Sequence, residues 1–202
     1  MIVIADYGVG NLKSVERMLA KAGCNAKLSS SPDEISKADR VILPGVGNFG
    51  ECARRLRSAP FYNVLIDYAR DRKMPVLGIC VGAQLLGHSS EEAPEEKGLG
   101  WIDMNCRRFP DRQGFRVPNI GWNSIKPVKE SPLLSHINEE SRFYFVHSFH
   151  FECASQDQVI ATANYGFDYP CIVRQENLLG MQFHPEKSLK HGMAILQKFS
   201  EL

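Results

Sequence analysis

The sequence predicts an α/β protein: a doubly wound, mostly parallel sheet flanked by helices, with a β-rich C-terminal half. Short apolar runs at 2–5, 40–45 and 74–80 each lead into a glycine-containing turn and then into a helical pattern. Strands that alternate with helices build parallel βαβ units, with helices on both faces of the sheet. After residue 98 the apolar runs become strand-like and are separated by turn residues such as Gly166 and Asn177.

The first half of the chain contains three of these units in order. The run "IVIA" at 2–5 leads through "DYGVGN" into a helix that is expected to stop at Gly23. One face of this helix collects Leu12, Val15, Met18, Leu19 and Ala22. The strand "RVILPG" at 40–45 precedes helical stretches over roughly 49–71, and "MPVLGIC" at 74–80 runs into "VGAQLLGHSS".

The second half is predicted to be mainly strands. A charged segment, "SSEEAPEEKG" at 89–98, is interpreted as a solvated surface loop. The strand-like runs that follow are at 101–109, 114–120, 142–151, 158–165 and 171–184. A final amphipathic helix at 188–202 aligns Met193, Leu196 and Phe199 on one stripe.

Composition indicates an ordinary globular protein. The 202 residues are 44% hydrophobic and 23% charged with a net charge of +1, which gives no broad attraction to nucleic acid or anionic lipid. The six cysteines are widely spaced and form no zinc-binding pattern, so we expect free thiols in a reducing compartment and no metal or other cofactor. With no signal-like or membrane-spanning run, the expected location is the cytoplasm.

The stretch "GICVG" at 78–82 sets Cys80 between two glycines where a buried strand meets a helix. Such an elbow lifts a nucleophile out of the sheet at the start of the next helix. Unpaired N–H groups near Val81 would favour the thiolate and could stabilise an oxyanion. The alternative interpretation is a small core cysteine that ends a buried strand.

A thiol nucleophile needs a base, and the base needs an orienting group. In "GMQFHPEKS" at 180–188, His184 ends a strand-like run and Glu186 follows two residues later, where an extended segment points side chains the same way. Glu186 could therefore bind one imidazole nitrogen while the other faces Cys80. The alternative is a solvated histidine and glutamate in a surface turn.

These residues carry a family resemblance. "GICVGAQLL" and "GMQFHPEKS" resemble the class I glutamine amidotransferases, which hydrolyse glutamine with a Cys-His-Glu triad. The ordered motifs "DYGVGN" (6–11), "LPGVGNFG" (43–50), "EKGLGWI" (96–102), "VPNIGWN" (117–123) and "YFVHSF" (144–149) extend the resemblance to the glutaminase subunits of imidazole glycerol phosphate synthase. The resemblance covers essentially the whole chain and implies a single flavodoxin-like domain over 1–202.

The resemblance implies a role for further residues. Cys80, His184 and Glu186 would be the catalytic triad, and the backbone N–H groups of Val46 and Val81 would stabilise the oxyanion. The substrate glutamine would be bound by Gly47, Gln84, Ser148 and Phe149. Without the resemblance, "LPGVG" is only a tight turn after a strand and Gln84 only an exposed helix residue. His147 is interpreted as a structural or partner-facing residue and not as a second base.

The resemblance also implies a partner. The family docks its glutaminase onto a (β/α)8 cyclase as a heterodimer, and the ammonia passes to the cyclase for histidine biosynthesis. Asn11, Trp122, Tyr144 and Lys187 fall at family positions that contact or gate this partner. The alternative for Trp122 is a partly buried core tryptophan.

Three residues depart from the family pattern: Ala83, Asn119 and Phe149. None belongs to the triad, but they leave a second acceptor open. Close relatives supply ammonia to an amidine-forming surface-polysaccharide sugar pathway. A non-catalytic binding subunit and a hydrolase or peptidase with the same cysteine elbow are further alternatives, which the intact triad and the ordered motifs argue against.

Overall fold

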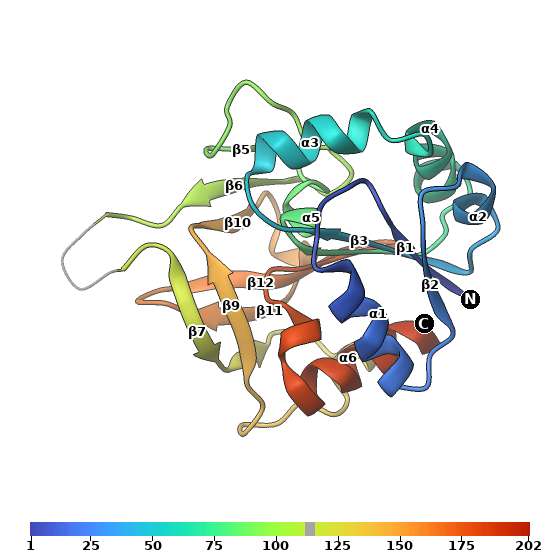
Figure 1. Cartoon of the computed structure of the whole chain (residues 1–202). Coiled ribbons are helices and arrows are strands. Elements are labelled where there is room, and N and C mark those ends of the chain that lie inside the picture. The colour runs from blue at the N-terminus through green and yellow to red at the C-terminus, as the bar shows by residue number, and fades with distance from the viewer. Residues whose placement is uncertain (112–115) are drawn as a thin grey trace.

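The computed structural model describes residues 1–111 and 116–202. Its centre is an eight-stranded sheet with the order β2-β1-β3-β4-β13-β12-β11-β8 (Figure 1). The first five strands pair in parallel: β2 (Ala26–Ser29), β1 (Ile2–Ala5), β3 (Arg40–Gly45), β4 (Val76–Cys80) and β13 (Leu178–Met181). The last three continue the sheet in antiparallel pairing: β12 (Asp168–Gln175), β11 (Val159–Asn164) and β8 (Ile125–Pro127).

Helices cover both faces of this sheet. In Figure 1, α3 lies above the sheet, whereas α1 and α6 lie below it and contact each other. The α-helices are α1 (Leu12–Lys21), α2 (Pro32–Ser36), α3 (Phe49–Arg57), α4 (Tyr62–Ile66), α5 (Val81–Gln84) and α6 (Leu189–Glu201). Shorter turns are the π-helical η1 (Asp67–Asp71) and the 3₁₀ helices η2 (Pro132–Leu134), η3 (Gln156–Gln158) and η4 (Pro185–Lys187).

Two small sheets extend from the main one, toward the left in Figure 1. One has the order β10-β6-β5, from β10 (Phe149–Cys153), β6 (Met104–Arg108) and β5 (Ser89–Ser90). The other pairs β7 (Asn119–Asn123) with β9 (Phe143–His147) in antiparallel register. Since β9 and β10 are separated only by Ser148, this residue lies at the junction of the two small sheets.

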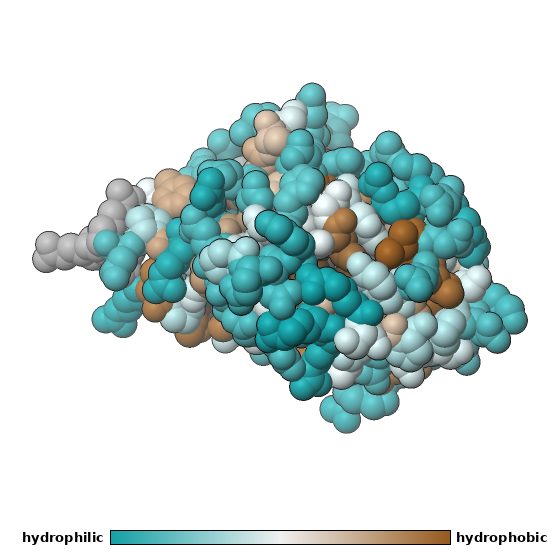
Figure 2. All heavy atoms as spheres, turned by 90° about the horizontal axis from the view of Figure 1, so that it is seen from above, coloured by the Kyte–Doolittle hydropathy of each residue, from teal (hydrophilic) through white to brown (hydrophobic). Residues whose placement is uncertain are grey.

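Burial explains why the central strands form. Every residue of β1, β4 and β13 is buried, as expected for parallel strands covered on both faces. Leu19 of α1 and Leu196 of α6 are fully buried beneath them. The face seen from above, over α3, is mostly hydrophilic with small separate apolar areas (Figure 2). Among the described residues, no helix has both the length and the apolar character needed to cross a membrane.

The predicted fold class is confirmed, with local differences. The strand β2 was not anticipated, because its residues are mostly half-buried at the edge of the sheet. The last strands join the main sheet in antiparallel pairing, which apolar patterns cannot reveal. In the predicted run at 114–120 the strand begins only at Asn119, and residues 114–115 lie outside the described residues.

The predicted surface loop at 89–98 is anchored to the body of the protein. Ala93 is buried, and Glu96 pairs with Arg54 and Arg57 of α3. A carboxylate oxygen of Glu92 accepts a hydrogen bond from the backbone N–H of Phe49 at 2.7 Å. The interpretation as a purely solvated loop is therefore wrong for these residues, because charged sequence alone does not show which carboxylates find partners.

Candidate active site

Cys80 is the last residue of β4 and has a strained backbone. Its φ is 55° and its ψ is −113°, outside the regions that a residue with a side chain normally occupies. Such strain persists only where the surrounding structure imposes it, and it is concentrated at functional sites. The side chain is displaced from the direction that the strand alone would give it, as the sequence pattern predicts for a nucleophile elbow.

The neighbouring glycines permit the strained turn through close packing. Neither Gly78 nor Gly82 has a positive φ, so the strained conformation belongs to the cysteine itself. A Cβ atom on Gly82 would lie 1.9 Å from the carbonyl oxygen of Leu43, and one on Gly78 would lie 2.5 Å from the Cα of Ala83. The glycines are required because the turn packs against neighbouring backbone.

The expected helix after Cys80 is only the four-residue α5. A single turn carries a small macrodipole, so little electrostatic help comes from the helix as a whole. What remains are the unpaired N–H groups of its first turn, which adjoin the cysteine.

His184 and Glu186 form a buried pair, as the spacing in the sequence predicts. The Nδ1 atom of His184 lies 2.8 Å from Oε1 of Glu186, and only 2% of the histidine is exposed. Because the carboxylate only accepts, Nδ1 carries the hydrogen, which leaves Nε2 available to interact with Cys80. The other carboxylate oxygen of Glu186 is buried without a hydrogen-bond partner among the described residues.

The surroundings of His184 favour its protonated form. Burial lowers the pKa of this imidazole, but hydrogen bonds and charge interactions with Cys80 and Glu186 outweigh burial and raise it above its usual range. A protonated imidazole beside a sulfur favours a thiolate, which is the nucleophilic form of cysteine. The three residues are arranged for nucleophilic catalysis with a histidine that can donate and accept a proton.

These residues border a cavity of about 320 Å³. Its lining contains nine of the residues that the sequence analysis assigned to the site, Val46, Gly47, Cys80, Val81, Gln84, Ser148, Phe149, His184 and Lys187, together with Glu92, Pro118, Val146 and His147. The register of the sheet explains this convergence, since Gly45 at the end of β3 pairs with Cys80 at the end of β4. The "PGVG" turn and the elbow therefore leave the sheet side by side.

The sequence patterns missed Glu92 as a lining residue. It is the only acidic side chain that lines this cavity among the described residues, and it belongs to the anchored loop at 89–98. The only sequence feature of Glu92 is its place in a charged segment, and such a segment predicts a surface loop and not a cavity wall. Only the hydrogen bond to Phe49 at the start of α3 reveals that the loop folds over the site.

His147 lies in a buried polar network beside the cavity. Its Nδ1 atom is 2.7 Å from the carbonyl oxygen of Phe149, so this nitrogen carries the hydrogen. Nε2 is 3.3 Å from the hydroxyl of Tyr169 and from the amide nitrogen of Asn119. Burial lowers the pKa of His147 to about 4, more than the bond to Phe149 raises it, so this histidine is neutral.

Acidification is expected to weaken the fold through His147. Its pKa of about 4 lies below the ordinary value of 6.5, so between these pH values the unfolded chain binds more protons. Its contribution to stability is complete above about pH 6.5 and is lost as the pH falls toward 4. From pH 7.5 to pH 5 the free energy of unfolding should fall by about 2 kcal/mol more in the wild type than in His147→Asn.

Denaturant unfolding at the two pH values measures this difference. The matched control is His136→Asn, because His136 is exposed to solvent. An equal fall in the wild type and in His147→Asn would contradict the assignment.

The four predicted partner-facing residues divide into two groups. Trp122 and Tyr144 make an edge-on ring contact at 5.8 Å, and the ammonium of Lys187 lies 5.5 Å from the centre of the Tyr144 ring. Trp122 is 46% exposed, which excludes the alternative of a core tryptophan. Asn11 instead donates a hydrogen bond of 3.3 Å to Oε1 of Glu186, so it contacts the triad.

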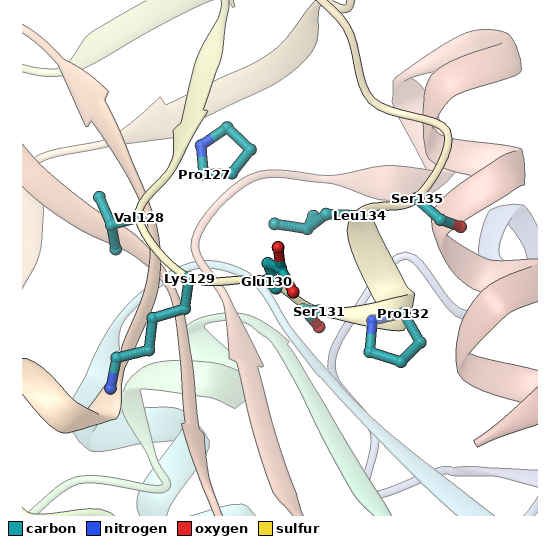
Figure 3. Close-up of a pocket in the computed structure, with 8 residues that line it drawn as sticks. All are labelled: Pro127, Val128, Lys129, Glu130, Ser131, Pro132, Leu134 and Ser135. Atoms are coloured by element: carbon teal, nitrogen blue, oxygen red, sulfur yellow. The ribbon is translucent and has the colours of Figure 1, made fainter.

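A larger groove of about 810 Å³ lies elsewhere, along residues 127–135 (Figure 3). Its ionisable residues are Lys129, which extends away from Leu134 in Figure 3 and pairs with Asp157, and Glu130. It contains no cysteine or histidine, so the smaller cavity is the candidate active site. Among the described residues, no group of three histidine, cysteine or acidic side chains could hold a metal ion.

Comparison with known families agrees with this geometry. The family model described as "Glutamine amidotransferase class-I" matches residues 3–201. The chain belongs to the class I glutamine amidotransferases. Among curated members of this family, it is 46% identical over 202 residues to "Imidazole glycerol phosphate synthase subunit HisH 2" of Pseudomonas aeruginosa, with both chains fully covered. It is 42% identical over 205 residues to subunit HisH of Leptospira borgpetersenii, again with both chains fully covered.

Solved structures of class I glutamine amidotransferases share the fold. "Structure of PurLQS from Thermotoga maritima" superposes with a TM-score of 0.77 at 17% identity, covering 98% of this chain and 96% of the other. "Crystal structure of glutamine amidotransferase" gives a TM-score of 0.75 at 19% identity, covering all of both chains. The identities to the HisH subunits are much higher, and they assign this chain to the HisH group within the family.

Proposed function

We propose that this chain is the glutaminase subunit of an imidazole glycerol phosphate synthase and acts as a single domain over residues 1–202. The observation that carries the proposal is the buried pair of His184 and Glu186 at 2.8 Å, whose histidine interacts with a cysteine on a strained elbow and lines the same cavity as this cysteine. The names of the HisH relatives support the same assignment and favour it over the surface-polysaccharide alternative. Free Cys80 is needed for this chemistry, so we infer that the protein works in the reducing cytoplasm.

The proposed reaction begins with attack of the Cys80 thiolate on the side-chain amide carbon of glutamine. His184 gives its proton to the leaving ammonia, and a thioester to Cys80 remains. The now neutral His184 then takes a proton from water, which attacks the thioester and releases glutamate. Glu186 keeps the imidazole oriented in both steps, and Asn11 holds the carboxylate of Glu186 through its amide.

Backbone groups would stabilise the oxyanion in both steps. The N–H of Val81 adjoins Cys80 on the elbow, and Val46 belongs to the turn beside it, so both are proposed as donors. The carbonyl of Val46 lies 3.3 Å from the thiol sulfur of Cys52 in α3, which ties this turn to the helix. Each oxyanion donor is worth about 3 kcal/mol of transition-state stabilisation.

The substrate would lie along the cavity lining. The side chain of Gln84, Gly47 and the segment Ser148–Phe149 surround the space beside Cys80, which supports their assignment to glutamine binding. Glu92 adds a negative charge at the wall of the cavity. We infer that this carboxylate faces the α-ammonium group of glutamine, because this is the only positively charged group of the substrate.

The ammonia would pass to a (β/α)8 cyclase subunit. Trp122 and Lys187 are exposed and contact the ring of the half-buried Tyr144, and Ile120 on the same strand β7 as Trp122 is 60% exposed. An exposed tryptophan flanked by an aliphatic, an aromatic and a basic side chain is typical of the anchor of a protein interface. Lys187 also lines the cavity, so a partner seated on this cluster would cover the side where ammonia forms.

Truncating Trp122 should weaken the heterodimer. Trp122→Ala is expected to reduce affinity for the cyclase at least ~10-fold, because buried tryptophan anchors dominate interface energies. Titration of the labelled cyclase with this chain measures the affinity. The control is Val128→Ala, since Val128 is also 46% exposed but lies in the separate groove.

Glutamate release tests the function as a whole. The chain is mixed with the cyclase encoded beside it, with and without the imidazole nucleotide that the cyclase uses. Strong stimulation by the nucleotide is the expected result. If the nucleotide does not change the rate of glutamine hydrolysis, the glutaminase assignment would stand, but the assignment of this cyclase as the ammonia acceptor would be contradicted.

A further inference from the structure

Gln182 is a fully buried polar residue that neither the triad nor the cavity lining includes. It follows β13 and precedes His184 by two residues, and its side chain is 0% exposed. Its backbone N–H is already bound to the carbonyl of Cys171 at 2.9 Å, so the side-chain amide makes separate contacts. A buried amide without partners is costly, so the partners that this side chain has are informative.

A chain of hydrogen bonds fixes how this amide is oriented. The carbonyl oxygen of Phe149 can only accept, and Nε2 of Gln84 lies 3.5 Å from it. The same Nε2 lies 3.3 Å from Oε1 of Gln182, which therefore accepts. The other end of the Gln182 amide is its NH₂ group. The nitrogen of this group, Nε2 of Gln182, lies 3.8 Å from the sulfur of Cys80. The orientation of both amides thus follows from the carbonyl oxygen of Phe149, which cannot donate a hydrogen bond.

We propose that Gln182 is a positioning residue that directs an amide hydrogen at the Cys80 sulfur and so holds it as an oriented thiolate. A donor stabilises an anionic acceptor more than a neutral one, so this contact favours thiolate over thiol. It approaches the sulfur separately from His184, whose imidazole also interacts with Cys80. The sulfur is then oriented by the Gln182 amide before substrate arrives.

The same series of hydrogen bonds links Cys80 to the segment Ser148–Phe149, which is proposed to bind the substrate. Phe149 lines the cavity, and its carbonyl accepts from His147 at 2.7 Å as well as from Gln84. A shift of this segment would change the position of the Gln84 amide and, through Gln182, the donor at Cys80. This inference rests on the proposed glutaminase function, in which Cys80 is the nucleophile.

The test compares two replacements of Gln182. Gln182→Leu removes the amide and keeps a similar volume, whereas Gln182→Glu keeps the acceptor toward Gln84 and exchanges only the donor for a carboxylate oxygen. Alkylation of Cys80 by iodoacetamide is followed against pH by mass spectrometry of the peptide that contains it. The midpoint should rise by about one pH unit in Gln182→Leu and further in Gln182→Glu, since a hydrogen bond to an ion is worth about that much.

Glutamine kinetics in the assembled heterodimer provide the second measurement. The kcat should fall at least ~10-fold in both variants while KM changes little, because Gln182 does not line the cavity. Four other titratable groups interact electrostatically with Cys80: His184, Tyr7, Cys52 and Cys106. All four remain in each variant, so a change in the midpoint reports the Gln182 amide.

The matched control is Gln158→Leu, which removes a buried amide that bonds to Gln175 far from the site. This control should leave the alkylation midpoint unchanged even where it lowers thermal stability. Folded Gln182 variants with an unchanged midpoint and unchanged kcat would overturn the inference. Alkylation needs no turnover, so this failure is distinct from failure of the proposed function, which would appear as glutamine hydrolysis that survives Cys80→Ala.

Discussion

Replacing Cys80 with alanine is expected to abolish glutamine hydrolysis, with a loss of at least ~10⁴-fold in kcat. Among the described residues that line the cavity, Cys80 is the only cysteine, and His184, which Glu186 orients, lies beside it. Glutamate release by the heterodimer measures the effect. The substitution removes one sulfur atom from a residue at the edge of the core, so the fold and the affinity for the cyclase should persist.

The control for this result is Cys24→Ala. Cys24 is a partly buried free thiol after α1, outside the cavity, and its replacement should leave kcat unchanged. A wild-type rate in Cys80→Ala would contradict the assignment of the nucleophile. Loss of activity in both variants would indicate a general effect of removing thiols.

Gly82→Ala is expected to remove the folded elbow. The added Cβ would lie 1.9 Å from the backbone oxygen of Leu43, and neither group can move without displacing β3 or α5. Overpacking against a flexible side chain costs about 1–3 kcal/mol, and a collision with backbone should cost more than about 3 kcal/mol of the free energy of unfolding. Thermal unfolding and glutamate release measure the two consequences.

Gly23→Ala is the matched control, because Gly23 is exposed and nothing lies within 4 Å of an added Cβ. Its φ of +75° makes alanine strained, at a cost of about 1 kcal/mol. Equal losses of stability in the two variants would contradict the prediction that close packing against Leu43 excludes a Cβ atom at Gly82.

The parallel half of the fold was predictable because its patterns are local. The apolar runs at 2–5, 40–45 and 74–80 contain the strands β1, β3 and β4, and the helical periodicity that stops at Gly23 matches α1. The antiparallel half was recognised as strands, but its pairing to β13 depends on contacts across the fold. The final helix was predicted with the stripe Met193, Leu196 and Phe199, whereas the structure buries Ile195 and leaves Met193 half-buried.

The site was predictable where one short motif held all the information. The spacing of His184 and Glu186 and the glycines around Cys80 indicated a candidate nucleophile and base, and the family resemblance implied that they form a triad. Glu92 and Gln182 were not assigned, because their roles depend on hydrogen bonds to Phe49 and Gln84, which are remote in sequence. His147 was interpreted as a structural or partner-facing residue, and its buried hydrogen bonds fit the structural role. The strained elbow at Cys80 was expected from the flanking glycines, but its positive φ could not be assigned to the cysteine from sequence alone.

The most direct test of the account is to identify the residue that carries the covalent intermediate. The heterodimer is mixed with labelled glutamine, quenched in acid during turnover and digested, and the label is located by mass spectrometry. The account predicts a glutamyl thioester on Cys80 alone among the six cysteines, and its accumulation in His184→Asn if hydrolysis slows more than attack. Label on another residue, or turnover with no label on Cys80, would contradict the central claim.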